Sequence, residues 1–250
     1  MKIKKLLFAS ALLFSAYNAS AQTQVIAHRG FWKTEGSAQN SIAALLKADS
    51  IGCYGSEFDV WLAADDQLVV NHDPTFKGKR MENSPSTALT AIKLDNGESL
   101  PTLAKYLKAA QPLHTRLILE LKAHSTPLRE TKAIEKIVAL VKDMGLEERM
   151  EYITFSLHAT KEFIRLAPEG TPVYYLDGNL SPKELKELGC AGPDYHYTVF
   201  RKHPEWIQEC HDLGMKVNAW TVNKTDDMKW LIDRKAVSYT HLRAHETLSD

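Results

Sequence analysis

The regular alternation of short apolar runs with amphipathic helical stretches constrains the fold of this chain more than any other feature. After Gln24 the chain passes repeatedly from a predicted strand to a predicted helix, as in the strand at 116–121 and the helix at 128–144. Strands that run parallel need such crossover helices between them. The pattern therefore predicts an α/β protein built on a parallel sheet with helices on its outside.

The number of predicted strands favours a closed barrel. Leaving aside an extended run at 68–72, seven strands are predicted, at 25–28, 54–62, 116–121, 151–155, 172–176, 194–197 and 216–222. Helices are predicted at 41–51 (with Asn40 as the N-cap), 103–110, 128–144, 159–166, 182–188, 204–213 and 225–234. Residues 73–100 are irregular and rich in Pro and Gly, which indicates a small insertion after the second strand. We therefore expect a (β/α)8 barrel of the TIM type.

The eighth strand of such a barrel should follow Arg234, but residues 236–250 contain no clean apolar run. We expect this strand to be missing or replaced. His241 and His245 lie four residues apart and precede Glu246, a spacing that could hold a metal on one helix face. A surface tail is the simpler alternative. We favour a third interpretation, a non-native tail joined to a truncated reading frame, which resequencing the locus through codon 235 tests.

The first 21 residues have the pattern of a secretory signal peptide. Lys2, Lys4 and Lys5 precede an apolar run at 6–17 that is too short to span a bilayer, and Ala19-Ser20-Ala21 fits a cleavage site. We therefore expect a periplasmic or secreted protein without stable membrane insertion after cleavage at Ala21. The predicted organisation is a signal peptide at 1–21, a barrel domain at 22–235 and an atypical tail at 236–250.

Charge and cysteine content exclude other classes of function. The chain carries 31 basic and 31 acidic residues and no basic stripe, so a nucleic-acid partner is not expected. Cys53, Cys190 and Cys210 match no metal-binding spacing. One disulfide with one thiol and three buried thiols both fit this count, and we expect the buried thiols.

Carboxylates lie on two predicted strands. Glu57 and Asp59 lie two residues apart on one strand and so share a face, and Glu120 ends the run at 117–119 on another strand. An exposed pair on an edge strand is the alternative for Glu57 and Asp59. In a parallel barrel, however, the carboxyl ends of all strands meet at one rim. Three converging carboxylates are hard oxygen ligands and predict a site for one divalent cation, Mg²⁺ or Ca²⁺.

Other polar residues also stand at predicted strand ends. His28 and His72 suit general acid and general base chemistry near neutral pH. Arg29 and Lys122 offer positive charge to an anionic substrate, and Trp220 could form a wall of the pocket. Each of these residues alone has a structural explanation, and their occurrence together is what indicates a site.

In this order the motifs resemble those of the glycerophosphodiester phosphodiesterase family. The resemblance covers residues 25–235 and rests on five motifs, His28-Arg29-Gly30, Glu57-Phe58-Asp59, Val70-Asn71-His72-Asp73, Glu120-Leu121-Lys122 and Trp220-Thr221-Val222-Asn223. It implies a barrel of the phosphodiesterase type, with Glu57, Asp59 and Glu120 as metal ligands. It further implies His28 and His72 as the acid/base pair, with Arg29 and Lys122 holding the phosphate.

One motif departs from the family pattern, because the sequence has Gln39-Asn40-Ser41 where the family usually has Glu-Asn-Thr. Gln39 is neutral, so metal affinity or preference is expected to differ.

The resemblance implies hydrolysis of small glycerophosphodiesters to an alcohol and glycerol 3-phosphate. A phospholipase D-like enzyme on intact lipid is an alternative, with Phe31, Trp32 and Phe76 as its approach surface. A non-catalytic phosphate-ligand-binding protein is disfavoured because both histidines and all three carboxylates are present. A carboxylate-pair glycosidase does not explain Arg29, Lys122 or the histidines.

Overall fold

The computed structural model describes residues 24–240, and within them eight parallel strands form a closed ring. Each strand pairs with its neighbours in chain order, and β1 pairs with both β2 and β11. The chain is therefore a TIM-type (β/α)8 barrel, as the alternating pattern predicted. The strands are β1 (Val25–Ala27), β2 (Gly55–Leu62), β6 (Arg116–Leu121), β7 (Met150–Thr154), β8 (Val173–Tyr175), β9 (Gly192–His196), β10 (Asn218–Trp220) and β11 (Val237–Thr240).

The eighth place in the ring is filled by β11, which lies inside the segment expected to be atypical. Val25 of β1 pairs with Ser238, and Asn218 of β10 pairs with Val237. The expectation of a missing strand is therefore wrong, and its alternative, replacement by tail residues, fits the structure. The ring closes because β1 and β10 each present an unpaired edge to this segment. The His241 and His245 pair and the predicted signal peptide lie outside the described residues.

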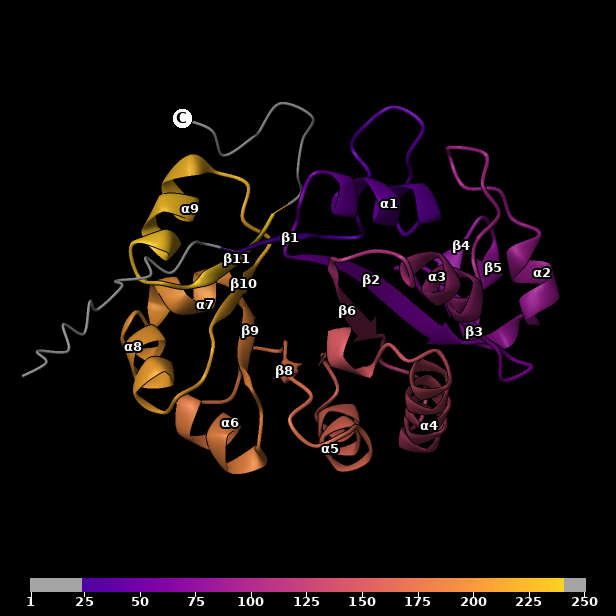
Figure 1. Cartoon of the computed structure of the whole chain (residues 1–250). Coiled ribbons are helices and arrows are strands. Elements are labelled where there is room, and N and C mark those ends of the chain that lie inside the picture. The colour runs from indigo at the N-terminus through magenta and orange to yellow at the C-terminus, as the bar shows by residue number, and fades with distance from the viewer. Residues whose placement is uncertain (1–23, 241–250) are drawn as a thin grey trace, which may run out of the picture.

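Helices surround the outside of the ring (Figure 1). They are α1 (Ile42–Ser50), α3 (Leu103–Ala110), α4 (Pro127–Asp143), α5 (Leu157–Leu166), α6 (Pro182–Leu188), α7 (Tyr197–Lys202), α8 (Glu205–Asp212) and α9 (Thr225–Ile232), with a 3₁₀ turn at Glu147–Arg149. The short helix α7 was not predicted. No helix in the described part of the chain combines the length and the apolar character that crossing a bilayer requires.

Side-chain caps determine where several helices begin. Ser41 accepts a hydrogen bond from the backbone of Ala44, so Ser41 and not Asn40 is the N-cap of α1. Asn40 was predicted in that role, but its backbone has a φ of 59° and its side chain binds elsewhere. At α6, Ser181 and Glu184 form a reciprocal capping box.

The predicted insertion is a folded excursion between β2 and β6. It contains β3 (Leu68–Val70), a hairpin of β4 (Thr75–Phe76) and β5 (Lys79–Arg80), a 3₁₀ turn at Met81–Asn83, and α2 (Ser86–Thr90) before α3. Strand β3 runs antiparallel to β2, with Val60 opposite Val70. A separate apolar cluster that includes Trp61, Val69 and Met81 holds the excursion against the barrel. The segment after β3, which carries His72, is thereby brought beside Asp59 of β2.

Apolar side chains fill the space between strands and helices in two large clusters. A smaller cluster that includes Ile26, Ile118 and Tyr174 occupies the barrel interior. The three cysteines are free and buried, as predicted. Burial raises the pKa of Cys53 and Cys210 to about 12 and that of Cys190 to about 11, so these thiols stay protonated and packed.

Candidate active site

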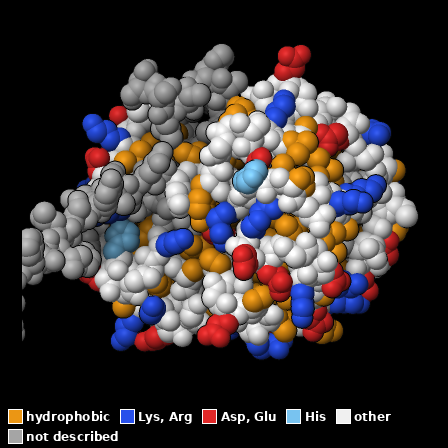
Figure 2. Space-filling model, viewed as in Figure 1, with side chains coloured by type: hydrophobic (Ala, Val, Ile, Leu, Met, Phe, Trp, Pro, Cys, Tyr) orange, Lys and Arg blue, Asp and Glu red, His pale blue; other side chains and the backbone are white. Residues whose placement is uncertain are grey.

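A cavity of about 170 Å³ opens at the carboxyl ends of the strands. Seven of the eight predicted site residues line it, and the eighth, Asp59, lies against one of them, Lys122. The full lining is His28, Arg29, Glu57, His72, Glu120, Lys122, Ile153, Phe155, Leu176, Asp194, Trp220 and Thr221. In Figure 2 a histidine lies near the middle of the visible face, with basic and acidic side chains beside it and hydrophobic patches around them. The fold therefore brings the predicted residues together.

Glu57, Asp59 and Glu120 form one buried cluster. An oxygen atom from each lies within 4.8 Å of the others. Glu57 and Asp59 share the inner face of β2, and Asp59 is level with Glu120 on the neighbouring β6. All three are buried and β2 has partners on both sides, so the alternative of exposed acids on an edge strand is wrong. Parallel pairing thus sets the spacing of the carboxylates.

The buried negative charge of these three carboxylates is unfavourable unless a cation lies between them. Burial, together with the charges of Asp59 and Glu120, raises the pKa of Glu57 well above its ordinary value. No donor among the residues that the structure describes forms a hydrogen bond with Glu57 Oε1. An unsatisfied buried carboxylate oxygen beside two further acids is costly unless positive charge lies between them. The three carboxylates therefore fit a hard divalent cation.

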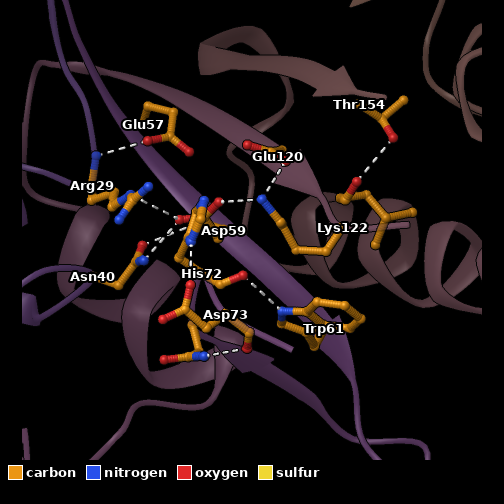
Figure 3. Close-up of polar contacts among 12 residues, drawn as sticks. Arg29, Asn40, Glu57, Asp59, Trp61, His72, Asp73, Glu120, Lys122 and Thr154 are labelled. Carbon is orange, nitrogen blue, oxygen red and sulfur yellow. Dashed lines mark hydrogen bonds and ion pairs between the residues drawn. The ribbon is translucent and has the colours of Figure 1, made fainter. Parts of the chain in front are cut away.

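Lys122 supplies part of the positive charge. Its Nζ lies 2.6 Å from Glu120 Oε1 and 3.2 Å from Asp59 Oδ1, so the ammonium bridges two acids (Figure 3). Burial alone lowers the pKa of Lys122, but Asp59 and Glu120 outweigh it and raise that pKa, which keeps the ammonium charged. Burial raises the pKa of Asp59, yet Lys122, His72, Asn40 and His28 together lower it to about 2. Asp59 is thus the fixed anion of the cluster.

The turn after β1 brings Arg29 and His28 to the rim. Arg29 has a φ of 60° and Gly30 a φ of 75°, so the chain reverses sharply there. The backbone amide of Arg29 donates to Glu57 Oε2 at 2.7 Å, and its Nη1 donates to Gln39 Oε1 at 2.5 Å. Gln39 therefore orients the guanidinium without neutralising it, whereas a carboxylate at this position would form an ion pair.

The two histidines reach the cavity from different elements. His28 follows β1, and its Nε2 lies 3.8 Å from Glu57 Oε2. His72 follows β3, and its Nδ1 lies 2.7 Å from Asp73 Oδ1, so its Nε2 is turned away from that carboxylate. Each histidine ring therefore has a carboxyl group beside it.

Three residues that hold this site were not predicted to do so. Asn40 donates to Asp59 Oδ2 at 2.8 Å and accepts from the Asp59 amide at 3.1 Å. Trp61 Nε1 donates to the carbonyl of His72 at 3.3 Å (Figure 3), and its ring lies 5.2 Å from that of His124. His124 Nδ1 lies 2.6 Å from the carbonyl of Lys122. The sequence signal for Asn40 was its place in the Gln39-Asn40-Ser41 stretch, and that for Trp61 and His124 was their closeness to the other motifs.

Comparison with known proteins agrees with this geometry. The model of the glycerophosphoryl diester phosphodiesterase family matches residues 28–238. A curated glycerophosphodiester phosphodiesterase from Caldanaerobacter subterraneus is 29% identical over 226 residues, which cover 84% of this chain and 90% of that protein.

Solved structures show the same likeness. A glycerophosphodiester phosphodiesterase from Parabacteroides distasonis is 52% identical, with a TM-score of 0.86 over 88% of this chain and 93% of that one. A phosphodiesterase from Oleispira antarctica, solved with the product sn-glycerol-3-phosphate, is 25% identical, with a TM-score of 0.72 over 87% of this chain and 92% of that one.

Proposed function

The chain belongs to the glycerophosphoryl diester phosphodiesterase family, and from this premise we propose that it uses one divalent cation and two histidines to hydrolyse glycerophosphodiesters to an alcohol and glycerol 3-phosphate. That such diesters are its substrates follows from the family and from its relatives. The observation that carries the proposal is the meeting of three buried carboxylates, two histidines and two cations around one cavity.

The charges of the site match a phosphodiester. Glu57, Asp59 and Glu120 would hold Mg²⁺ or Ca²⁺, which supplies stabilisation of the negative charge that develops on the phosphate in the transition state. Three carboxylates, one divalent cation, Arg29 and Lys122 leave one positive charge before substrate binds. A phosphodiester brings one negative charge, so these groups and the bound phosphate together carry no net charge.

The chain's own residues perform the remaining steps. Arg29 donates in a planar fork to phosphate oxygens, and Lys122 acts as a point charge beside them. One histidine takes the proton from the nucleophile, which is water or the substrate's own glycerol hydroxyl, and the other gives a proton to the departing alkoxide. Attack by the hydroxyl forms a cyclic phosphate, which water then opens to glycerol 3-phosphate. His28 and His72 line the cavity and have the chemistry for these tasks.

Replacing either histidine tests the proposal. We expect His28→Asn and His72→Asn each to lower kcat for glycerophosphocholine by about 10²–10⁴-fold, because each removes one proton transfer. His211 on α8 offers a control, since His211→Asn should leave kcat unchanged. EDTA should abolish turnover, and added Mg²⁺ or Ca²⁺ should restore it. Near-normal activity in either rim variant would refute the assignment.

Intact lipid is the alternative substrate, and the aromatic residues cited for it have other partners. Phe31 packs against Ala27 and Cys53, and Phe76 packs against the cluster around Met81. Two of the three aromatic residues are thus explained by packing within the protein. Assays on soluble diester and on phospholipid vesicles separate the two substrates.

We also propose export to the periplasm or the medium, which the pattern at 1–21 supports.

A further inference from the structure

His72 lies in a bend of the chain, beyond the ladder that joins β2 and β3. Strand β3 ends at Val70, and residues 71–73 belong to no helix or strand. A residue inside a paired strand has its backbone fixed by ladder hydrogen bonds, and His72 lies past the last of these pairs. A group that transfers a proton must nonetheless stay within hydrogen-bond reach of the reacting atoms. Other contacts are therefore needed to hold His72 at the cavity.

Trp61 provides such a contact. It lies two residues after Asp59 on β2, so both side chains project from the same face of that strand. The indole Nε1 of Trp61 donates to the backbone carbonyl of His72 at 3.3 Å (Figure 3). Trp61 is only 6% exposed and packs in the apolar cluster with Val69 and Met81. A closely packed indole has little freedom to change rotamer, so its N–H is a fixed point for the segment that carries His72.

The imidazole of His124 lies against this indole, with ring centroids 5.2 Å apart. The backbone amide of Leu62 donates to His124 Nε2 at 2.9 Å, and His124 Nδ1 lies 2.6 Å from the carbonyl of Lys122. An amide N–H can only donate and a carbonyl can only accept, so Nε2 is unprotonated and Nδ1 carries the proton. Burial lowers the pKa of His124, which favours the same neutral ring. Both ring nitrogens are therefore used, and the imidazole is fixed between β2 and the segment after β6.

We propose that Trp61 and His124 are positioning residues that hold the backbone of His72 at the cavity. This inference rests on the proposed function, in which His72 transfers a proton. Because His124 also holds the carbonyl of Lys122, one neutral ring links the segment that carries a phosphate-binding cation to the segment that carries a proton-transfer group. Small displacements of a reacting group lower turnover steeply, so loosening His72 should reduce kcat.

A double-mutant cycle on kcat for glycerophosphocholine tests the role of Trp61. Trp61→Phe keeps an aromatic ring and removes the N–H. We expect it to lower kcat about tenfold and to leave KM unchanged, because substrate binding does not use this bond. In the His72→Asn background the same change should lower the remaining kcat by less than about twofold, since the group that it positions is already gone.

Trp206→Phe is the matched control. The Trp206 ring also stacks on a histidine, His203, with centroids 4.4 Å apart, but neither residue lines the cavity. This variant should leave kcat unchanged.

His124→Phe tests the second positioning residue. It keeps a ring beside Trp61 and removes both hydrogen bonds of the imidazole. We expect kcat to fall at least about threefold and KM to rise, because the carbonyl of Lys122 also loses its donor. Adding Trp61→Phe to His124→Phe should lower kcat further by much less than about tenfold, since the two side chains act on the same segment.

The cycle separates positioning from a general loss of folding, which would lower kcat by the same factor in both backgrounds. Equal losses with and without the His72 imidazole would therefore overturn the inference. An unchanged kcat in Trp61→Phe would overturn it too, and so would fully additive losses from Trp61→Phe and His124→Phe. The proposed function would stand in each case if His72→Asn alone lowers kcat. Normal turnover by His72→Asn would instead refute the proposed function.

Discussion

The buried carboxyl of Glu120 links proton binding to folding. Burial and the charge of Asp59 raise its pKa from 4.5 to about 7. At pH values between 4.5 and about 7, Glu120 of the metal-free protein is therefore protonated in the folded state and ionised in the unfolded state. The free energy of unfolding should fall as the pH rises from 4.5 through about 7, and then level off.

Thermal unfolding of EDTA-treated protein checks this prediction. We expect a lower Tm at about pH 8 than at about pH 5.5. Glu120→Gln keeps the shape of the side chain without its charge, so its Tm should depend less on pH. Added Mg²⁺ or Ca²⁺ should recover the Tm of the unaltered protein at the higher pH, since a bound cation favours the ionised carboxylate. Equal pH dependence of the two proteins would contradict the assignment.

Single residues of the site were predictable where one rule of geometry sufficed. Glu57 and Asp59 share a strand face, and Glu120 joins them because parallel strands end at one rim. Asn40 was missed because its role depends on a left-handed backbone, with a φ of 59°, that turns its amide toward Asp59. Trp61 acts on a backbone carbonyl, a contact that exists only once the excursion has folded.

The connection between β1 and α1 depends on Gly30. A Cβ at this position would lie 2.6 Å from Ala44 Cβ and 2.7 Å from the Ala44 carbonyl carbon, and the φ of 75° disfavours other residues. We expect Gly30→Ala to lower the free energy of unfolding by about 2–4 kcal/mol, from backbone strain plus overpacking. Urea denaturation measures this change.

Gly97 is the matched control for Gly30. Its φ is 85°, but nothing lies within 4 Å of a Cβ built on it. Gly97→Ala should therefore cost only the backbone strain, about 1 kcal/mol. If the two variants lose the same stability, the contact with α1 does not constrain the turn.

Whole elements were predicted well where the hydrophobic period was clear, and poorly where the element was too short to show a period. The strand Arg116–Leu121 and the helix Pro182–Leu188 have the predicted bounds. The excursion was read as irregular because its strands β4 and β5 have two residues each, too few to show a period. The helix α7 was absorbed into a predicted loop, since six residues carry little helical signal.

At the scale of the whole molecule, closure of the barrel depends on β11. This strand pairs with β1 on one side and β10 on the other. A chain ending after Lys235 would leave both neighbours with open edges. We expect it to unfold roughly 10 °C lower than a chain ending after Thr240, and to aggregate. Calorimetry and size-exclusion chromatography compare the two, and equal Tm values would show that the barrel does not need this strand.

The barrel as a whole was predictable because seven strands repeat one pattern along the chain. The eighth was not, because residues 237–240 form only a short run that is not continuously apolar, although Val, Tyr and Thr favour strands and the run pairs with β1 and β10. Strand formation depends on neighbours more than on intrinsic preference. Prediction from local sequence therefore missed β11, whose pairing with β1 and β10 closes the ring.

The two histidines have separate structural origins, and this has a consequence for engineering. His28 follows a barrel strand, whereas His72 follows β3, an antiparallel strand outside the parallel ring. The three carboxylates Glu57, Asp59 and Glu120 all belong to strands of the ring. A redesigned barrel that omits the excursion could therefore retain the capacity to capture a metal and a phosphate while being inert. In the proposed mechanism, metal and phosphate binding depend on the ring, whereas turnover also requires His72 from the segment after β3.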